Sequence, residues 1–557
     1  MFSAQASQTY SMHTQDGVRL DADVYRPNIK GPNGEGPFPV LLMRQPYGRA
    51  IASTVVYAHP SWYAAQGYIV VIQDVRGRGT SAGKFTLFEN EVADGEDTLK
   101  WASQLPNCDG QVGMYGFSYQ GMTQLYAAQS AAQSKVQSKI TALKTIAPAM
   151  TGYYPYEDWA YENGALCLQL GLNWAIQLAA ETARIEGNAL THQKLVAAAH
   201  RLPLFDNLPA RPDVLEGVDS FFHDWVANPH SNEYWQRLTP QLKNVDMPML
   251  HIGGWFDPYL RGDLRLYQEM TARSAYAQPL CVGPWGHIPW GRKVGEMDFG
   301  SAAMSPIDEL QIQWFDHVLK GKALPEEALS VSLFEMGSNQ WRGFDAWPES
   351  SNRPYFLQSN GLANIREDGG KLSWEAVPDV RYDSVVHDPW NPAPALGGHS
   401  TIPAGVFERT AVDARGDVLT YTSAPLIDEM RVVGVVEVVG AIASTAPSYD
   451  LCAVLSRVQG GKVYNLTQGY QRIDQAESTT AVPVTLPLHP TCFSLAPGEC
   501  LRLSLSAACF PAYPVNPGTG AQPSAARLIE AEIVVLAIAI GGKNGMQINL
   551  PLAAADD

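Results

Sequence analysis

The sequence has few cysteines and no long apolar run. Its 7 cysteines among 557 residues are scattered, odd in number and form no CxxC pair, so we expect neither a disulfide framework nor a zinc site. No stretch approaches the roughly 18 consecutive apolar residues that span a membrane. The first residues, MFSAQASQTYSMHTQDGVRL, lack the basic and apolar regions of a secretory signal. These absences predict a cytoplasmic protein.

Basic residues are outnumbered. The chain has 39 Lys and Arg against 56 Asp and Glu, a formal net charge of −17, which argues against nucleic acid and anionic membrane surfaces as partners. No HExxH, CxxC or EF-hand pattern occurs, so the sequence implies no metal and no cofactor. With 46% hydrophobic and 17% charged residues, the chain has the composition of two to four folded domains with sizeable cores.

The first 145 residues have the pattern of a parallel α/β sheet. Short apolar runs at 38–48, 67–79 and 110–121 each end in a Gly-rich loop, and a segment with helical spacing at 96–105 lies between two of them. In such sheets ligands bind at the carboxyl ends of the strands, so the chemistry is expected in these loops.

The pattern changes at about residue 146. Segments 157–187 and 191–202 are rich in Ala and Leu and predict helices, so 146–240 is interpreted as a helical insertion. The strand signal resumes at 247–257 and 278–287, which assigns 241–340 to a second part of the α/β core.

After residue 340 the sequence has an all-β character. Runs rich in Val, Leu and Ile at 431–439, 449–459, 500–510 and 527–540 are separated by turns rich in Pro, Gly and Asn. They predict a β-sandwich or jelly roll over 341–557.

Ser118 lies in the stretch YGFSYQG, between Gly116 and Gly121, after a strand-like run and before a helix-like one. A serine hydroxyl needs a base to become a nucleophile, and α/β-hydrolases place it on a sharp strand-to-helix turn with small neighbours. The pattern here is G-x-S-x-x-G rather than the commoner G-x-S-x-G. Alone it fits equally well a serine that only caps a helix.

The partners of such a serine follow it in the order acid, then histidine, each after a later strand of the sheet. Asp257 ends the apolar run HIGGWFD, and His287 ends the next run, CVGPWGH. His251 lies inside a strand run and is interpreted as a packed core histidine. We therefore predict that Ser118 attacks a carbonyl carbon, that His287 moves the proton and that Asp257 orients His287.

These motifs resemble the cocaine esterase (CocE/NonD) family of serine hydrolases, which are relatives of the X-Pro dipeptidyl-peptidases. The resemblance rests on RQPYGR, DVRGRGTSAGKF, CDGQVGMYGFSYQG, GGWFDPY, GPWGHIPWG and FPAYPVNPGTG, and it covers almost the whole chain. It implies the α/β fold class, namely an α/β-hydrolase core with an inserted helical cap and a C-terminal jelly roll. It also implies an oxyanion hole formed by the Tyr47 hydroxyl and the Tyr119 N–H, and relatives often form homodimers.

The loop DVRGRGTSAG needs a separate interpretation. Arg76 and Arg78 among glycines suggest phosphate binding, but no GK[ST] follows and the chain is acidic. We interpret it as a tight loop that braces the core, with Asp74 in a structural role.

The expected partner is a small-molecule ester or amide, bound between core, cap and jelly roll. Aromatic residues near the start of the cap and beside Asp257 suit a bulky apolar acyl group, although aromatics at helical spacing are commonly core packing. The predicted substrate contacts are Tyr154, Trp159, Trp174 and Phe256.

Two alternatives involve a substrate with a free amine. The resemblance extends to α-amino-acid ester hydrolases, which carry acidic residues directly after the catalytic aspartate, whereas Pro258 to Arg261 follow Asp257 here. An X-Pro dipeptidyl-peptidase also needs an acidic clamp, which Glu157, Asp158 and Glu162 can supply unless they form a solvated helix start. The sequence favours an esterase or amidase without an amine requirement. A catalytically inactive carbohydrate- or ligand-binding protein is the remaining alternative.

Overall fold

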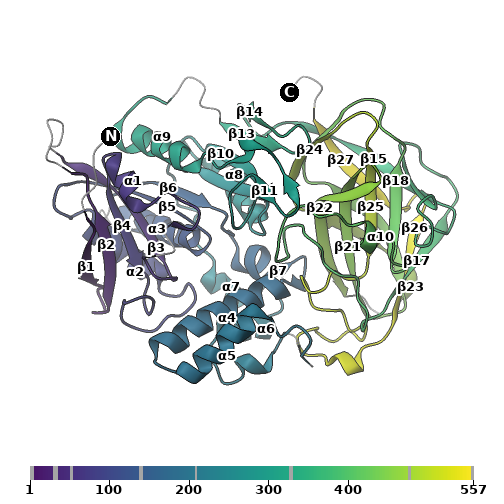
Figure 1. The fold of residues 1–557 in the computed structure, drawn as a ribbon, viewed down its shortest axis with the longest axis horizontal. Coiled ribbons are helices and arrows are strands. Elements are labelled where there is room, and N and C mark those ends of the chain that lie inside the picture. The colour runs from purple at the N-terminus through teal and green to yellow at the C-terminus, as the bar shows by residue number, and fades with distance from the viewer. Residues whose placement is uncertain are drawn as a thin grey trace.

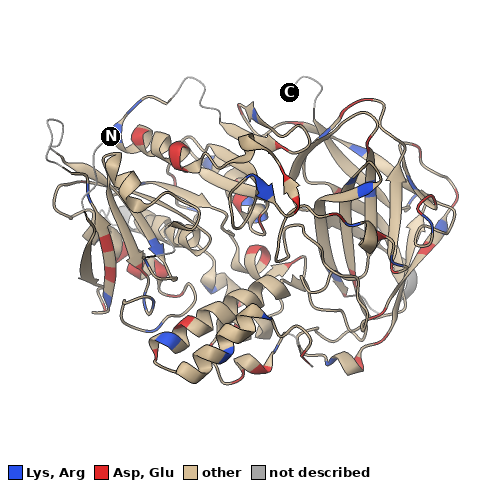
Figure 2. Cartoon of the chain, in the orientation of Figure 1, with Lys and Arg blue, Asp and Glu red and all other residues tan. Residues whose placement is uncertain are grey.

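The structure is a computed structural model that describes residues 6–28, 36–50, 54–136, 142–206, 208, 210–324, 330–474 and 478–553. Figure 1 shows a helix-covered sheet at one end, a β-rich part at the other and a group of helices beneath the junction. Figure 2 shows acidic and basic positions interspersed over these parts. In the described part of the chain, no helix is both long enough and apolar enough to cross a membrane.

A ten-stranded sheet forms the core. Its order is β1-β2-β4-β3-β5-β6-β9-β10-β13-β14. The strands are β1 Gln8–His13, β2 Arg19–Tyr25, β3 Phe38–Gln45, β4 Ile69–Asp74, β5 Cys108–Phe117, β6 Leu143–Ala149, β9 His251–Phe256, β10 Leu280–Gly286, β13 Val331–Glu335 and β14 Gln340–Phe344. From β4 to β13 neighbouring strands pair in parallel, so their carboxyl ends meet at one edge.

Helices cover both faces of this sheet. They are α1 Pro60–Ala65, α2 Glu91–Ala102, α3 Tyr119–Val136, α8 Leu260–Arg273 and α9 Ile307–Lys320. Strand β3 illustrates why both faces are apolar. Val40 and Leu42 pack with residues of α2 and α3, whereas Leu41 and Met43 pack with residues of α1 and α9. Alternate residues of a strand point to opposite faces, so a buried central strand reads as a continuous apolar run.

The cap lies between β6 and β9 in the sequence and beneath the junction in Figure 1. Its elements are η2 Pro155–Ala160, β7 Tyr161–Glu162, β8 Ala165–Leu166, α4 Leu168–Ile185, α5 Ala189–His200, η3 Asp213–Leu215, α6 Phe221–Ala227 and α7 Glu233–Leu238.

The helix predicted over 157–187 is wrong in its first part. A single π-helical turn and a two-stranded hairpin come first, and the helix begins only at Leu168. The hairpin turns on Asn163 and Gly164, which have φ angles of 43° and 84°. An Asn-Gly pair suits such a turn because both residues tolerate positive φ.

The C-terminal part is a β-rich domain joined almost entirely by antiparallel pairs. Its strands are β15 Ser350–Ser359, β16 Gly370–Ser373, β17 Arg381–His387, β18 Val418–Ser423, β19 Met430–Gly434, β20 Glu437–Ser444, β21 Ser448–Gln459, β22 Lys462–Asp474, β23 Ser478–Pro487, β24 Thr491–Leu495, β25 Cys500–Ser506, β26 Val534–Ile540 and β27 Gln547–Ala553.

The strand predicted over 527–540 begins only at Val534, and residues 528–530 form the short 3₁₀ helix η5 Leu528–Glu530. Short elements elsewhere are β11 Lys293–Val294, β12 Met297–Asp298, η4 Ser301–Ala303 and α10 Thr410–Asp413. The domain limits at 145, 240 and 340 stay predictions.

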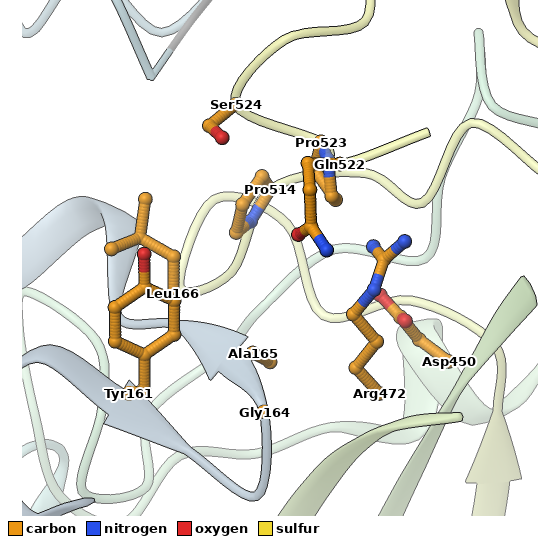
Figure 3. Close-up of a pocket in the computed structure, with 10 residues that line it drawn as sticks. All are labelled: Tyr161, Gly164, Ala165, Leu166, Asp450, Arg472, Pro514, Gln522, Pro523 and Ser524. Carbon is orange, nitrogen blue, oxygen red and sulfur yellow. The ribbon is translucent and has the colours of Figure 1, made fainter. Parts of the chain in front are cut away.

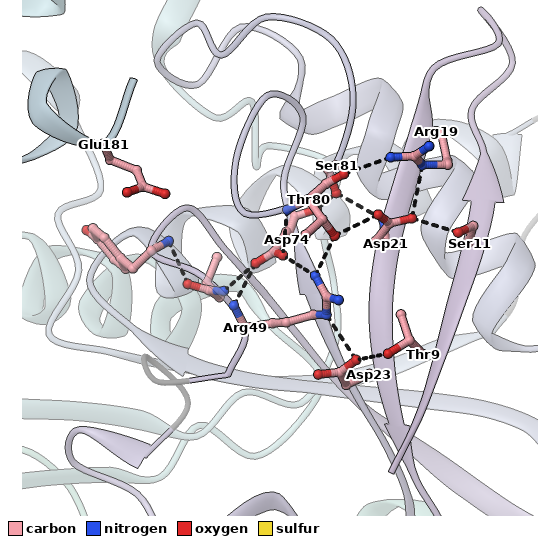
Figure 4. Close-up of polar contacts among 12 residues, drawn as sticks. Thr9, Ser11, Arg19, Asp21, Asp23, Arg49, Asp74, Thr80, Ser81 and Glu181 are labelled. Atoms are coloured by element: carbon pink, nitrogen blue, oxygen red, sulfur yellow. Dashed lines mark hydrogen bonds and ion pairs between the residues drawn. The ribbon is translucent and has the colours of Figure 1, made fainter. Parts of the chain in front are cut away.

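The loop after β4 has the predicted bracing role (Figure 4). Asp74 is 1% exposed and accepts hydrogen bonds from the Gln45 amide at 2.9 Å and the Arg49 guanidinium at 2.6 Å. A Cβ atom at Gly79 would lie 2.0 Å from a carboxylate oxygen of Asp74. The glycine thus lets the loop close over the carboxylate, which ties β3 and β4 together.

His251 is a core residue, as predicted, and it makes stability depend on pH. The ring is buried in β9, its Nε2 lies 2.9 Å from Gln278 Oε1, and burial lowers its pKa to about 4. An unfolded histidine has a pKa of about 6.5, so between these values the unfolded chain binds more protons and acidification favours unfolding.

We expect His251 to account for a loss on the order of 3 kcal/mol of unfolding free energy as pH falls through this window. Urea unfolding at neutral pH and near pH 5 should give a smaller difference for His251→Gln than for wild type. Equal differences in the two proteins would contradict the assignment.

Candidate active site

Ser118 stands on a sharp turn between β5 and α3. Its φ angle is 60°, in the left-handed region that non-glycine residues rarely adopt, and it is 6% exposed. Its backbone N–H donates to the carbonyls of Ala149 at 3.0 Å and Met150 at 3.1 Å, at the end of the neighbouring strand β6. Helix N-cap residues ordinarily have extended backbone, so this conformation sets Ser118 apart from a simple capping serine. It matches the strained strand-to-helix turn on which α/β-hydrolases carry their nucleophile.

The small residues around Ser118 explain its G-x-S-x-x-G pattern. A Cβ atom on Gly116 would lie 2.5 Å from Gln120 Cβ, and one on Gly121 would lie 2.6 Å from Thr151 Cβ. Thr151 in turn donates its hydroxyl to the Ser118 carbonyl at 2.8 Å. At Gly121, three residues after the serine, helix α3 packs directly against the loop after β6. This close approach explains why the second glycine stands at that position.

His287 and Asp257 form a pair at the ends of β10 and β9. His287 Nδ1 lies 2.5 Å from Asp257 Oδ2. The other carboxylate oxygen, Oδ1, accepts the backbone N–H of Tyr259 at 2.8 Å. The Asp257 side chain is 0% exposed, whereas that of His287 is 28% exposed. The carboxylate is thus fixed at both oxygens, and the imidazole that it holds is partly exposed to solvent.

Ring contacts bring His287 to the elbow. Its ring centroid lies 5.3 Å from that of Phe117, the residue before Ser118, and 5.1 Å from that of Tyr259. The Trp290 indole N–H donates to the His287 carbonyl at 3.0 Å and so holds the loop from the other side. Sequence reasoning missed Tyr259 in this setting, although its place two residues after Asp257, in the triplet DPY, is a signal for an Asx-type turn.

The predicted oxyanion donors lie beside Ser118. Tyr47 follows β3, its hydroxyl hydrogen-bonds with the Ser118 side chain, and it accepts the Trp174 indole N–H at 3.1 Å. Burial raises the pKa of Tyr47 to about 12, so the phenol stays protonated at neutral pH. Tyr119 is the first residue of α3, and a helix leaves its first N–H groups without internal partners.

Two of the predicted substrate contacts lie together in an aromatic cluster. Trp159 lies 5.1 Å from Trp174 and 4.2 Å from Tyr259, centroid to centroid. Trp174 reaches the site directly through its bond to Tyr47.

The other two predicted contacts lie elsewhere. Tyr154 stacks on Tyr153 at 4.3 Å and has Arg265 over its ring, and Phe256 packs in the apolar cluster that includes the C-terminal strands. All four roles in substrate binding stay predictions.

The three acidic residues that were considered as an ammonium clamp, Glu157, Asp158 and Glu162, each form an ion pair within the protein. Asp158 is buried and accepts from the backbone N–H groups of Tyr153 and Tyr154 and from Arg265. Glu157 is the exposed member and pairs with the same arginine at 3.0 Å.

Glu162 is buried as well. It pairs with Arg261 at 2.6 Å, lies 2.8 Å from His399 Nε2 and accepts the Tyr513 hydroxyl at 2.6 Å. Arg261 and His399 hold the pKa of Glu162 well below its usual range, against the effect of burial. Neither buried carboxylate is a solvated helix start; both join the cap to its neighbours.

A small cavity lies where the cap hairpin meets the C-terminal domain (Figure 3). It is lined by Tyr161, Gly164, Ala165, Leu166, Asp450, Arg472, Pro514, Gln522, Pro523 and Ser524. None of these is a predicted site residue, so this cavity belongs to the domain interface. Among the residues that the structure describes, no three His, Cys, Asp or Glu side chains are grouped to hold a metal ion.

Comparison with known proteins agrees with this arrangement. Residues 16–289 match the family model of the X-Pro dipeptidyl-peptidase (S15 family), and residues 326–539 match that of the X-Pro dipeptidyl-peptidase C-terminal non-catalytic domain. The cocaine esterase of Rhodococcus sp. (strain MB1 Bresler) is 30% identical over 97% of both chains. The chain belongs to the cocaine esterase (CocE/NonD) family.

As a member of the cocaine esterase family, the protein is a serine hydrolase that acts on ester bonds. A putative serine esterase of Mycobacterium bovis is 24% identical over 90% of both chains. An aminopeptidase from a marine sediment archaeon, Thaumarchaeota archaeon, is 20% identical with a TM-score of 0.81, covering 99% of this chain and 97% of the other. An α-amino acid ester hydrolase has 20% identity, a TM-score of 0.77 and the same coverage. The predicted fold class is confirmed.

Proposed function

We propose that this chain hydrolyses small carboxylic esters, and related amides, through an acyl-enzyme on Ser118. The observation that carries the proposal is the 2.5 Å pair between His287 and the buried Asp257, next to a serine held at a φ of 60°. A serine in that turn projects its hydroxyl, and a histidine with a fixed tautomer can take its proton.

The proposed reaction consists of two half-reactions. Ser118 Oγ bonds to the carbonyl carbon while His287 takes the hydroxyl proton, and the carbonyl oxygen becomes an oxyanion that Tyr47 and the Tyr119 N–H stabilise. The tetrahedral intermediate collapses, the C–O bond to the alcohol breaks, and His287 returns the proton to the leaving oxygen. Water then repeats the sequence on the acyl-enzyme and releases the carboxylic acid.

The substrate is proposed to lack a free amine. An ammonium group needs an unpaired carboxylate, and Asp158 and Glu162 are each paired with arginine inside the protein. The residues that follow Asp257, from Pro258 to Arg261, include no acidic residue that could hold an ammonium group. The aminopeptidase and the α-amino acid ester hydrolase share the fold at 20% identity. They do not favour an amine-dependent activity over the esterase.

A substrate panel tests this proposal. We expect p-nitrophenyl esters of benzoic or short aliphatic acids to give a kcat/KM at least about 100-fold above that of α-amino-acid aryl esters, which corresponds to roughly 3 kcal/mol. N-acetylated amino-acid esters are the matched control, since they keep the side chain and lose the charge. A preference for the free amine would contradict the proposal and favour the X-Pro or amino-ester alternative.

The setting of the enzyme is also proposed. All seven cysteines are free in the structure, which supports a reducing compartment such as the cytoplasm. The partner is taken to be the small-molecule substrate, without nucleic acid or membrane, and a homodimer remains a prediction from the resemblance.

A further inference from the structure

Arg78 belongs to the Gly-rich loop after β4 and has no part in the steps above. The sheet order β4-β3-β5 places the end of β3 between the ends of β4 and β5. Tyr47 follows β3 and Ser118 follows β5. Arg78, Tyr47 and Ser118 thus follow three neighbouring strands, and the charge of Arg78 acts on both Tyr119 and Tyr47.

Arg78 is a buried cation without a directly paired carboxylate. It is 2% exposed, and in the described ranges no carboxylate lies within ion-pair distance of it; Glu181 and Asp219 act on its charge only from farther away. One nitrogen donates to the Leu178 carbonyl and to Thr182 Oγ1, both at 3.1 Å, Nε has no acceptor, and the guanidinium lies 3.9 Å from the centroid of Phe85.

Two other arginines in this part of the core have their charges neutralised by carboxylates. Arg44 is also buried but pairs with Glu91 at 2.7 Å. Arg76, two residues before Arg78 on the same loop, pairs with both Asp94 and Asp16. An unneutralised buried charge is costly for stability, so its presence beside a catalytic centre indicates a functional use.

The charge of Arg78 acts on the predicted oxyanion donor. Burial lowers the pKa of Arg78 to about 10, which leaves the guanidinium charged at neutral pH. Its field lowers the pKa of the Tyr47 phenol, against the larger effect of burial. A more acidic phenol donates a stronger hydrogen bond to an anion.

Hydrogen bonds also connect Arg78 to Tyr47 through helix α4. The Leu178 carbonyl that Arg78 binds lies one helical turn after Trp174 on α4, and Trp174 donates its indole N–H to the Tyr47 hydroxyl. Arg78 thus holds the cap helix that holds Tyr47.

We propose that Arg78 is a positioning residue for the oxyanion. It anchors α4 over Tyr47 and supplies the positive charge that strengthens the hydrogen bond from Tyr47 as negative charge develops on the substrate oxygen. The inference rests on the proposed function, because it requires attack by Ser118.

The test compares Arg78→Met and Arg78→Lys, with Arg76→Gln as the control from the same loop. The readouts are kcat and KM on a p-nitrophenyl ester, the melting temperature, and the Ki of an aryl trifluoromethyl ketone, which forms an anionic hemiketal with an active serine. Arg78→Met should lower kcat at least about tenfold, less than loss of the donor itself, and raise the Ki in parallel while KM changes little. Its melting temperature should not fall, because a buried unpaired charge is removed.

Arg78→Lys should recover most of kcat. Arg76→Gln should keep the kcat, KM and Ki of wild type, although its melting temperature should fall because it leaves the buried Asp94 unpaired. Unchanged kcat and Ki in Arg78→Met would overturn the inference, as would equal losses in the Met and Lys variants with raised KM and lowered melting temperature. If Arg78→Met does not fold, Arg78→Gln replaces it in the same comparison with Lys. Failure of wild type to react with the ketone would instead contradict the proposed function itself.

Discussion

Replacing Asp257 with Asn is expected to lower kcat by about 10⁴-fold, or roughly 5.5 kcal/mol of transition-state stabilisation. The 2.5 Å contact to His287 Nδ1 requires that nitrogen to carry a proton, so that Nε2 is free to accept one from Ser118. An amide is nearly isosteric but can present its NH₂ group to Nδ1, which favours the other tautomer and removes the charge that stabilises the imidazolium.

The control for this variant is Asp308→Asn. Asp308 is a partly buried carboxylate on α9 that accepts from the Ala58 backbone N–H and from the Tyr63 hydroxyl. An asparagine there keeps an acceptor, so kcat should stay within a few-fold of wild type. Steady-state kinetics on a p-nitrophenyl ester, with circular dichroism to verify folding, gives the comparison. A folded Asp257→Asn enzyme with near-normal kcat would remove Asp257 from the proposed triad.

Tyr47→Phe is expected to lower kcat by about 10²- to 10³-fold, equivalent to roughly 3–4 kcal/mol, with little change in KM. The phenol is protonated, lies against the Ser118 side chain and is held by the Trp174 indole. Phenylalanine keeps the ring and removes only the donor. Because the oxyanion exists only after attack, the loss should fall on kcat.

Trp174→Phe distinguishes the hydrogen bond that Tyr47 donates to the oxyanion from the orientation of Tyr47 by Trp174. It leaves the Tyr47 hydroxyl in place and removes one bond to it, so we expect a smaller loss, on the order of tenfold. The measurement is kcat and KM for the two single variants and the double variant on one ester. If Tyr47→Phe loses less than Trp174→Phe, Tyr47 is a packing residue and the oxyanion donor must be sought elsewhere.

The three residues of the proposed triad could be predicted from the sequence because the reaction restricts their type and their order along the chain. Ser118, Asp257 and His287 were predicted from chain order and from their position after apolar runs, and the parallel sheet brings those three strand ends to one edge because parallel strands share a direction. The structural role of Asp74 was predicted by elimination, because the loop lacks the GK[ST] of a phosphate site and the chain is acidic.

Other features could not be predicted because they depend on contacts between distant segments. The composition predicted a helix that begins at residue 157. The structure has a hairpin there instead, which the Asn163–Gly164 turn and the hydrogen bond from Tyr513 to Glu162 favour. Local propensity could not show this, because Tyr513 lies 351 residues away from Glu162 along the chain. The Asn-Gly pair was a legible turn signal within that run.

The contacts of Trp174 and Arg78 are likewise tertiary. Nothing in the run LNWAIQ shows that its indole bonds to Tyr47, and nothing in DVRGRG shows that its second arginine lacks a directly paired carboxylate. Both features depend on contacts between helix α4 of the cap and the core. The sequence did identify the aromatic composition of the cap, but it could not distinguish Trp159 and Trp174, which lie near the site, from Tyr154, which stacks on Tyr153.

The most direct test of the central claim is intact-mass spectrometry after treatment with a fluorophosphonate. The account predicts one covalent adduct on wild type, mapped to Ser118, and none on Ser118→Ala, with loss of esterase activity in step with labelling. A folded, active wild-type enzyme that takes no adduct, or a Ser118→Ala variant that is still labelled and active, would contradict Ser118 as the nucleophile.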